Sequence, residues 1–277
     1  MRDLFVGASS GLSVGQTRRM VTTTDSPLDL FRLDGRVALV TGASAGLGAR
    51  FARVLHAVGA TVVVSARRSE RLDELVAELP GSIAIAADLA IADDRERLVN
   101  EALDRAGRID VLVNNAGVSY TVGIEQETLE QFERAMEVNA TGVWHLTKLC
   151  VPHMVERGSG SIVNVASMLG HVGSAPIKQA NYCASKGAVV NLTRELALQL
   201  SRRGVRVNAL CPGYFPSEMT EPMIDDESSQ NYLRTYSGIP RMGEDHELDG
   251  ALLLLASDAG SYITGHSLLV DGGFTAR

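Results

Sequence analysis

The sequence predicts an α/β fold, in which a doubly wound parallel sheet of seven strands lies between two layers of helices. From residue 36 onward, short runs of β-branched residues alternate with longer segments of helical periodicity, as in strands joined by crossover helices. A glycine-rich turn directly follows the first of these runs. With 277 residues, 45% of them hydrophobic, the chain can form one large core, so we expect a single domain.

The strands and helices follow one another in a regular order. Short segments rich in Val, Ile, Leu and Ala are predicted to be strands: 36–42, 61–66, 82–88, 109–117, 160–167, 206–213 and 266–273. Segments with helical periodicity lie between them: 46–58, 69–79, 93–106, 128–156, 181–203 and 246–257. Because parallel strands need crossover connections, these helices should cover both faces of the sheet, giving three α/β/α layers. The segment 214–245 breaks the alternation and is predicted to be a lid.

The first 33 residues differ from the rest of the chain, since they are rich in Ser, Thr and Gly and show no sustained periodicity. We expect residues 1–33 to be a flexible extension and residues 34–277 to form the folded domain. The extension contains GASSGL at 7–12, which imitates the glycine turn of the domain but lacks a convincing preceding strand and a closing glycine. We assign that segment no function.

The composition argues against several classes of function. A net charge of −7 argues against nucleic-acid binding, which usually requires a basic face. No apolar run approaches the roughly 20 residues of a membrane helix, so we expect no membrane contact. The cysteines Cys150, Cys183 and Cys211 are far apart and have no metal-ligand spacing. We therefore expect no disulfide, no metal site and a cytoplasmic protein.

The segment VALVTGASAGLGARFARVL contains a strand, a glycine turn and a helix in that order. Gly42, Gly46 and Gly48 have the spacing Gly-x-x-x-Gly-x-Gly. Glycine lets the backbone approach a ligand closely, and the N-terminus of a helix offers unpaired N–H groups to a pyrophosphate. A purely structural turn is the alternative, but the strand before it and the helix after it favour a dinucleotide site in a Rossmann-like fold.

The end of the second predicted strand, VVVSARRSERL, is where the adenosine ribose of a dinucleotide should lie. A carboxylate there would bind the 2′-hydroxyl of NAD(H), but Ala66, Arg67 and Arg68 offer two cations instead. Two cations suit the 2′-phosphate of NADP(H). In the alternative, both arginines are solvated and have Glu70 and Asp73 as local partners. We predict NADP(H) rather than NAD(H).

A tyrosine and a lysine four positions apart lie in the predicted helix 181–203. This spacing places Tyr182 and Lys186 on one helix face, on neighbouring turns. Only three of the 26 basic residues are lysines, so arginine serves almost everywhere that a positive charge suffices. The pair is either an amphipathic edge or a place where the compact ammonium of lysine is needed.

Motifs along the chain resemble, in the same order, those of the short-chain dehydrogenase/reductase family in its single-domain form. The resemblance extends from about residue 33 to residue 274. The matching positions are TGASAGLG at 41–48, Asp88, NNAG at 114–117, Asn139, Ser167, Tyr182 with Lys186, CPG at 211–213 and VDGG at 270–273.

The resemblance implies an oxidoreductase that interconverts a ketone and a secondary alcohol by hydride transfer to or from NAD(P). Tyr182 would be the general acid and base, and Ser167 would hydrogen-bond the carbonyl oxygen. Lys186 and the positive nicotinamide would lower the pKa of Tyr182 from about 10 toward 7. Asn139 would hold a water that joins Lys186 to solvent, or would instead brace a helix as a buried residue.

The resemblance also implies a set of cofactor contacts, with Asp88 contacting the adenine and no metal in the site. The set is Gly42, Ser44, Gly46, Leu47, Gly48, Arg67, Asp88, Leu89, Asn115, Ala116, Gly117, Tyr182, Lys186, Pro212, Gly213 and Ser217.

Two positions depart from the usual family pattern. The gap between Ser167 and Tyr182 is longer than usual, which leaves Ser174 as an alternative for the serine role. Ser217 stands where many members have a threonine near the carboxamide, and it keeps the hydroxyl.

The substrate is left open by these residues. Sugar-acid (gluconate-type) dehydrogenases and 3-oxoacyl-thioester reductases fit the pattern. The lid segment 218–238 offers only Arg234 as a cation, so a neutral carbonyl compound fits at least as well. His171, four residues after Ser167, is a candidate substrate contact, whereas His145 is expected to pack on a helix.

A non-catalytic dinucleotide sensor is the alternative from a different class, although it would not need Tyr182 or Ser167. Family members generally assemble as dimers or tetramers, so the resemblance implies a homotetramer or a dimer. The apolar segments 251–256 and 267–270 would then help to form the interface, or would be ordinary core.

Overall fold

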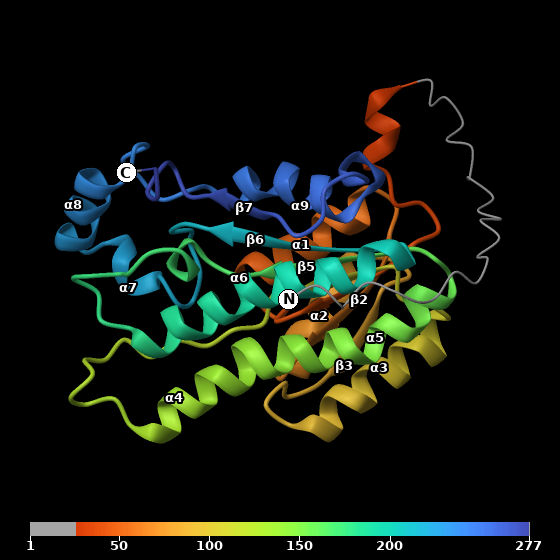
Figure 1. Cartoon of the computed structure of the whole chain (residues 1–277), viewed down its shortest axis with the longest axis horizontal. Coiled ribbons are helices and arrows are strands. Elements are labelled where there is room, and N and C mark those ends of the chain that lie inside the picture. Colours follow the sequence, from red (N-terminus) through yellow and green to blue (C-terminus); the bar gives the residue numbers. More distant parts are fainter. Residues whose placement is uncertain (1–25, 277) are drawn as a thin grey trace, which may run out of the picture.

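The computed structural model describes residues 26–276, and its centre is one seven-stranded sheet (Figure 1). All neighbouring strands are parallel, and their order is β3-β2-β1-β4-β5-β6-β7. The strands are β1 Val37–Thr41, β2 Thr61–Ala66, β3 Ile83–Ala86, β4 Val111–Asn114, β5 Gly160–Val165, β6 Val205–Pro212 and β7 Ser267–Val270. The prediction of a doubly wound parallel sheet is confirmed, with each strand inside or within one residue of its predicted range.

Helices cover both faces of the sheet, as predicted. On β1, Ala38 and Val40 pack in one core cluster, while Val37 and Leu39 pack in another on the opposite face. Residues of α1, α2 and α9 complete the first cluster, and residues of α3, α5 and α6 complete the second. These helices are α1 Gly46–Ala57, α2 Ser69–Glu78, α3 Ala92–Ala106, α5 Gly142–Glu156, α6 Ala180–Leu200 and α9 Asp249–Ala256.

The helix predicted over 128–156 is interrupted in the structure. It consists of α4 Leu129–Met136, a turn of π-helix at Glu137–Thr141, and α5. Within this turn, Asn139 donates a hydrogen bond from Nδ2 to the carbonyl of Val118, 2.8 Å away. Periodicity cannot reveal a π-turn of this kind, which inserts one extra residue into an otherwise helical segment.

The segment 214–245, predicted as a lid, contains two short helices, α7 Glu221–Ile224 and α8 Glu227–Tyr236. Asp226 caps α8, since its carboxylate accepts a hydrogen bond from the Ser229 amide at 2.7 Å. Tyr232 and Leu233 anchor α8, because both are buried. The prediction contained neither helix: α7 has only four residues, too few to show periodicity, and α8 lies in the segment that was predicted as a lid.

The packed structure begins before the predicted boundary at residue 34. Pro27–Phe31 form a 3-10 helix, and the Leu33 side chain is fully buried in the core with α1. The expectation of a flexible arm is therefore too broad at its C-terminal end, and residues 1–25, including the segment 7–12, lie outside the described residues. No helix between residues 26 and 276 is long and apolar enough to cross a membrane.

The order of the strands creates a crevice between the carboxyl ends of β1 and β4, because the connections from these two neighbours lead in opposite directions. Thr41 links the two ends, since its hydroxyl accepts hydrogen bonds from the amides of Asn115 at 3.0 Å and Ala116 at 3.2 Å. Gly48 lets α1 pack on the turn after β1, where an added Cβ would lie 2.2 Å from the carbonyl oxygen of Gly42.

Buried polar side chains connect α6 to the centre of the sheet. Asn114 on β4 donates to Oδ1 of Asn164 on β5 at 2.9 Å. Asn164 donates in turn to the hydroxyl of Thr193 on α6 at 3.0 Å, and Thr193 donates to the carbonyl of Val189 at 2.8 Å. This chain of hydrogen bonds, in which both amide nitrogens and the threonine hydroxyl have acceptors, fixes the position of α6 over the sheet.

Thr193→Val keeps the side-chain volume but leaves Nδ2 of the buried Asn164 without its acceptor. We expect the free energy of unfolding to fall by about 1–3 kcal/mol, measured by urea denaturation. Thr193→Ser is the matched control, because it keeps the hydroxyl and loses one methyl group, which costs about 1 kcal/mol. A serine variant less stable than the valine variant would contradict the importance of this hydrogen bond.

Candidate active site

A cavity of about 400 Å³ opens at the carboxyl ends of the central strands. Its walls contain every residue of the predicted cofactor set, together with Ser167: Gly42, Ser44, Gly46, Leu47, Gly48, Arg67, Asp88, Leu89, Asn115, Ala116, Gly117, Tyr182, Lys186, Pro212, Gly213 and Ser217. Asn139 is the one predicted site residue outside this lining, and it is fully buried. Among residues 26–276, no group of three or more His, Cys, Asp or Glu side chains is placed to hold a metal ion.

One end of the cavity has the chemistry to bind a pyrophosphate. The helix α1 begins there without a side-chain cap, because its N-cap residue, Ala45, makes no side-chain hydrogen bond. Uncapped N–H groups and the positive end of the helix dipole favour an anion. Gly42 and Gly46 have positive φ angles of 66° and 51°, which L side chains rarely adopt. The residues of the glycine turn therefore fit a dinucleotide phosphate.

The two arginines after β2 have different partners. Arg68 donates to the Ser44 hydroxyl at 2.9 Å and to the Glu218 carboxylate at 2.8 Å. Within residues 26–276, Arg67 makes no side-chain hydrogen bond or ion pair, but its charge helps to lower the pKa of Asp88. Neither arginine pairs with the local acids Glu70 and Asp73, which the sequence left as the alternative.

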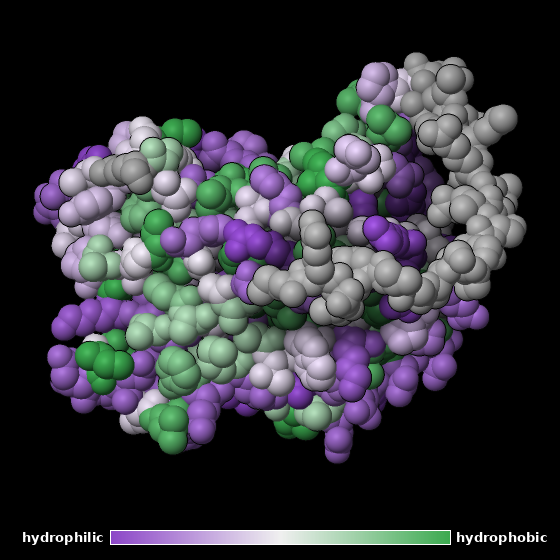
Figure 2. All heavy atoms as spheres, in the orientation of Figure 1, coloured by the Kyte–Doolittle hydropathy of each residue, from purple (hydrophilic) through white to green (hydrophobic). Residues whose placement is uncertain are grey.

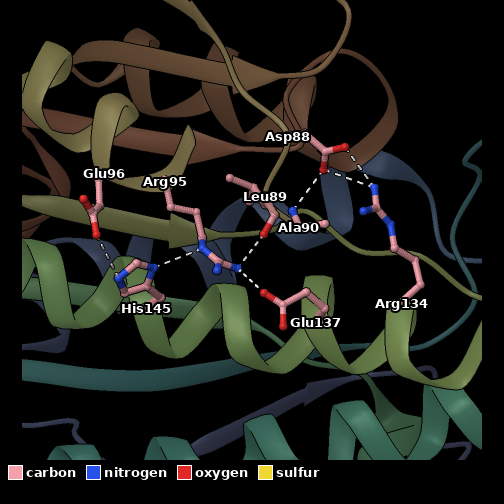
Figure 3. Close-up of polar contacts among 8 residues, drawn as sticks. All are labelled: Asp88, Leu89, Ala90, Arg95, Glu96, Arg134, Glu137 and His145. Atoms are coloured by element: carbon pink, nitrogen blue, oxygen red, sulfur yellow. Dashed lines mark hydrogen bonds and ion pairs between the residues drawn. The ribbon is translucent and has the colours of Figure 1, made fainter. Parts of the chain in front are cut away.

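Asp88, in the loop after β3, is held by residues that the sequence did not indicate (Figure 3). Arg134 on α4 donates to both carboxylate oxygens, at 2.9 and 3.1 Å, and the Ala90 amide donates at 2.9 Å. Burial acts to raise the pKa of Asp88, but these hydrogen bonds outweigh it and hold the pKa below the ordinary value. The carboxylate is thus ionised and fixed at the cavity wall.

Arg95 joins the same loop to the π-turn and α5 (Figure 3). Its guanidinium donates to the carbonyl of Leu89 and to the carboxylate of Glu137, both at 2.7 Å, and to Nδ1 of His145 at 3.1 Å. The Arg95 side chain is 4% exposed, so these contacts replace almost all of its hydration. His145 is part of this structural network and does not line the cavity, in line with the packing role expected for it.

At the other end of the cavity lie Ser167, Tyr182 and Lys186. Lys186 donates to the carbonyl of Val165 at 2.7 Å, and its Nζ is 5.5 Å from the centre of the Tyr182 ring. Burial lowers the pKa of Lys186 to about 8. Burial also raises the pKa of Tyr182 to about 12, although a hydrogen bond with Ser167 acts in the opposite direction. The lowered pKa expected for Tyr182 is therefore not a property of the protein alone.

Both polar atoms of the Asn139 side chain make hydrogen bonds inside the protein. Its Oδ1 accepts from the Val118 amide at 2.8 Å, and its Nδ2 donates to the Ser185 hydroxyl at 2.9 Å. Ser185 donates in turn to the carbonyl of Tyr182 at 2.8 Å. This geometry agrees with the bracing role that the sequence left open, and it connects the π-turn to the backbone of Tyr182.

The remaining candidates lie at or beyond the edge of the cavity. Ser174 donates to the carbonyl of Ile177 in its own loop at 2.7 Å and does not line the cavity, unlike Ser167. Nε2 of His171 lies 3.6 Å from Sγ of Cys211, and burial lowers the pKa of this histidine. Neither residue reaches the cavity wall with Tyr182.

Two charged lining residues, Arg134 and Glu218, were missed by sequence reasoning. Their ion-pair partners Asp88 and Arg68 are 46 and 150 residues away in the chain, so no local pattern connects them. The only available signal was an arginine on the helix before Asn139 and an acid in the predicted lid.

The strand order, the uncapped glycine turn and the cavity define a Rossmann-like dinucleotide-binding protein. A family model described as short chain dehydrogenase matches residues 36–228. The chain belongs to the short-chain dehydrogenase/reductase family. It is accordingly an oxidoreductase of that family, acting on CH–OH groups of a small molecule with an NAD(P) cofactor.

Relatives with different substrates are similar to nearly the whole chain. Gluconate 5-dehydrogenase of Gluconobacter oxydans is 38% identical over 252 residues, which cover 89% of this chain and 97% of the relative. The 3-oxoacyl-(acyl-carrier-protein) reductase FabG of Thermotoga maritima is 37% identical over 246 residues, covering 87% and 98%. The crystal structure of a gluconate 5-dehydrogenase from Burkholderia cenocepacia in complex with NADP and tartrate has a TM-score of 0.86 and 34% identity, covering 91% of this chain and 100% of that one.

Lys186→Met should stabilise the protein at neutral pH. Because the pKa of Lys186 is lowered from 10.5 to about 8 by burial, its charge costs stability below about pH 8, and the cost fades between these two values. Allowing for the lost hydrogen bond to Val165, we expect a gain in unfolding free energy of about 1–2 kcal/mol at pH 7. Urea unfolding should show this gain disappearing by about pH 10.

Lys148→Met, at an exposed lysine on α5, is the control and should give no such gain. A Lys186→Met variant that is less stable than the parent at neutral pH, with no dependence on pH, would contradict the electrostatic cost of burying Lys186.

Proposed function

We propose that the protein is an NADP(H)-dependent oxidoreductase that interconverts a ketone and a secondary alcohol, with Tyr182 as the general acid and base. The observation that carries this proposal is that one cavity joins Ser167, Tyr182 and Lys186 to an uncapped helix N-terminus and an unpaired arginine. The bound cofactor would supply or accept the hydride. In this proposal the lid over 214–245 belongs to the same catalytic domain.

Side chains of the protein would transfer the proton to or from the substrate oxygen. In carbonyl reduction, the Tyr182 hydroxyl donates its proton to the carbonyl oxygen, and the Ser167 hydroxyl hydrogen-bonds the same oxygen as negative charge grows there. In alcohol oxidation Tyr182 accepts the proton. The ammonium of Lys186 stabilises the phenolate, and positive charge on an oxidised nicotinamide would add to it, which together oppose the effect of burial on Tyr182. Asn139 connects the π-turn to the Tyr182 backbone through Ser185 and so helps to position Tyr182.

The preference for NADP(H) rests on Arg67. This residue lines the cavity just after β2, where the fold binds an adenosine ribose, and it makes no hydrogen bond or ion pair within the described residues. A 2′-phosphate would give Arg67 a direct ion-pair partner. The NADP in the structure of the Burkholderia cenocepacia relative supports the same choice.

The charges of the cavity favour a neutral substrate over a sugar acid. Among the described residues that line it, the cations are Arg67, Arg68, Arg134 and Lys186. The first three lie at the adenosine end or pair with acids there, and Lys186 is bonded to Val165. No lining cation is left to clamp a carboxylate, so we propose a neutral hydroxyketone or polyol as the substrate class. Galactitol 2-dehydrogenase of Cereibacter sphaeroides, 39% identical, is a relative with such a substrate in its name.

We also propose that the protein forms a homotetramer or a dimer. Figure 2 shows apolar residues along the front of α6, and the Leu198 side chain on this helix is 78% exposed. The edge strand β7 is only partly covered, with Leu269 exposed. By contrast, Leu252, Leu255 and Ala256 of α9 are buried as ordinary core, so α9 supports an interface less than β7 does.

The reaction is tested by following nicotinamide absorbance with NADPH or NADP⁺ over polyols, ketoses, sugar acids and acyl thioesters. We expect turnover with at least one neutral hydroxylated substrate and a fall of about 100-fold or more in Tyr182→Phe, because the proton donor is lost. Cofactor affinity should change little. Tyr120→Phe, a tyrosine outside the cavity lining, is the control. Turnover that survives in Tyr182→Phe would overturn the mechanism, and tight cofactor binding without turnover would favour a sensor.

Arg67→Ala should weaken NADPH binding by about 10-fold or more and leave NADH binding nearly unchanged, since only NADPH carries the 2′-phosphate. Fluorescence titration measures both dissociation constants. Arg53→Ala is the matched control, because it changes the net charge equally at an arginine paired with Glu78 outside the cavity. Equal weakening of both cofactors by Arg67→Ala would show that Arg67 does not recognise the 2′-phosphate.

A further inference from the structure

Glu218 of the lid pairs with Arg68, which precedes α2. The two side chains form a bidentate pair, with Nη1 to Oε1 at 2.8 Å and Nη2 to Oε2 at 3.1 Å. The guanidinium also donates from Nη2 and Nε to the Ser44 hydroxyl of the glycine turn, at 2.9 and 3.3 Å. Lid, glycine turn and β2 are thus joined in one polar network, and all three residues line the cavity.

Arg68 and Ser44 have the chemistry of an anion-binding site, and the Glu218 carboxylate already occupies it. A guanidinium presents a fork of donors that suits a carboxylate and a phosphate equally well, and a serine hydroxyl beside it adds a further group for phosphate oxygens. The Arg68 hydrogen bonds hold the pKa of Glu218 below its ordinary value, so the carboxylate is ionised at neutral pH and compensates the charge of Arg68. Arg67, one residue earlier, makes no hydrogen bond or ion pair among residues 26–276.

We propose that Glu218 is an internal competitor for the 2′-phosphate of the cofactor, and so a residue that sets the discrimination between NADP(H) and NAD(H). This proposal rests on the NADP(H) preference proposed above and deepens it. A dinucleotide with a 2′-phosphate takes the donors of Arg68 and Ser44 away from Glu218, whereas NAD(H) leaves the pair intact.

Replacement of Glu218 by a 2′-phosphate would also affect the position of the lid. Ser217, the neighbour of Glu218, lies against the glycine turn, where a Cβ added to Gly46 would be 3.5 Å from Cβ of Ser217. The Arg68 pair therefore holds this part of the lid against the turn before a cofactor arrives. Displacement of Glu218 by a 2′-phosphate frees the segment, so the lid responds differently to the two cofactors.

The expected effect is modest. The side chains of Arg68 and Glu218 are 45% and 62% exposed, and ion pairs in such surroundings are weakened by water and salt. Removing the competing carboxylate should therefore tighten binding of a 2′-phosphate by about two- to fivefold. The gain should shrink as the salt concentration rises.

Glu218→Gln tests the competition, because glutamine keeps the shape and removes the charge. Dissociation constants are measured by calorimetry for NADPH, NADH and adenosine 2′,5′-bisphosphate. We expect two- to fivefold tighter binding of NADPH and of the bisphosphate and no change for NADH. Glu221→Gln, at an exposed acid of the lid outside the cavity lining, should change none of them. In an Arg68→Gln background the effect of Glu218→Gln should vanish, because the contested donors are gone.

Two results would overturn the proposal. Unchanged or weaker binding of the bisphosphate by Glu218→Gln would show that the carboxylate does not compete. Equal weakening of NADPH and NADH would show that the Glu218 pair closes over a bound cofactor as a strap.

A measurement without cofactor separates this proposal from the cofactor preference. Hydrogen exchange of the segment 214–224 should be faster in Glu218→Gln than in the parent and unchanged in Glu221→Gln. If Arg67→Ala weakens NADPH and NADH binding equally, only the proposed recognition of the 2′-phosphate by Arg67 fails. Hydrogen exchange of the lid and binding of the bisphosphate still test the role of Glu218. Equal exchange in the parent and in Glu218→Gln would overturn the role of Glu218 in holding the lid.

Discussion

The burial of Lys186 is the constraint on which the rest of the site depends. Its side chain is 3% exposed and its ammonium is held by one backbone carbonyl, that of Val165 at the end of β5. Without water, the charged form of this lysine and the phenolate of Tyr182 are both disfavoured, so the pKa values of the two groups are moved toward their neutral forms. A site of this kind costs stability in the resting protein, and in the proposed chemistry the positive charge of an oxidised cofactor would favour the phenolate of Tyr182.

Hydrogen bonds far from solvent keep this arrangement in place. Asn164 and Thr193 tie α6 to the centre of the sheet, while Asn139 and Ser185 tie the π-turn to the backbone of Tyr182. Arg95 extends the same support to the loop that carries Asp88, through Leu89 and Glu137. The two ends of the cavity are therefore connected through buried polar contacts, each of which has a defined partner.

Local patterns in the sequence predicted the strands, the main helices and the glycine turn, because each depends on residues close together in the chain. They could not predict the π-turn, which depends on contacts of Asn139 with Val118 and Ser185, or the pairing of Arg68 with Glu218 across 150 residues. They also could not indicate that the pKa of Tyr182 is raised in the protein without cofactor, since spacing indicates a neighbouring charge but not the degree of burial. Leu33 was assigned to the extension because one apolar residue carries no periodicity.

The central claim is that the charge of the oxidised cofactor, together with Lys186, brings Tyr182 into its reactive ionised form. The most direct measurement is the ultraviolet difference absorbance of tyrosinate as NADP⁺ is titrated into the protein near pH 7.5, where Lys186 is still mostly charged, compared with Tyr182→Phe. Since the pKa of Tyr182 is about 12 without cofactor, the account predicts a tyrosinate signal that appears on binding and is absent from the variant. Tight binding with no tyrosinate signal, or an equal signal in Tyr182→Phe, would contradict it.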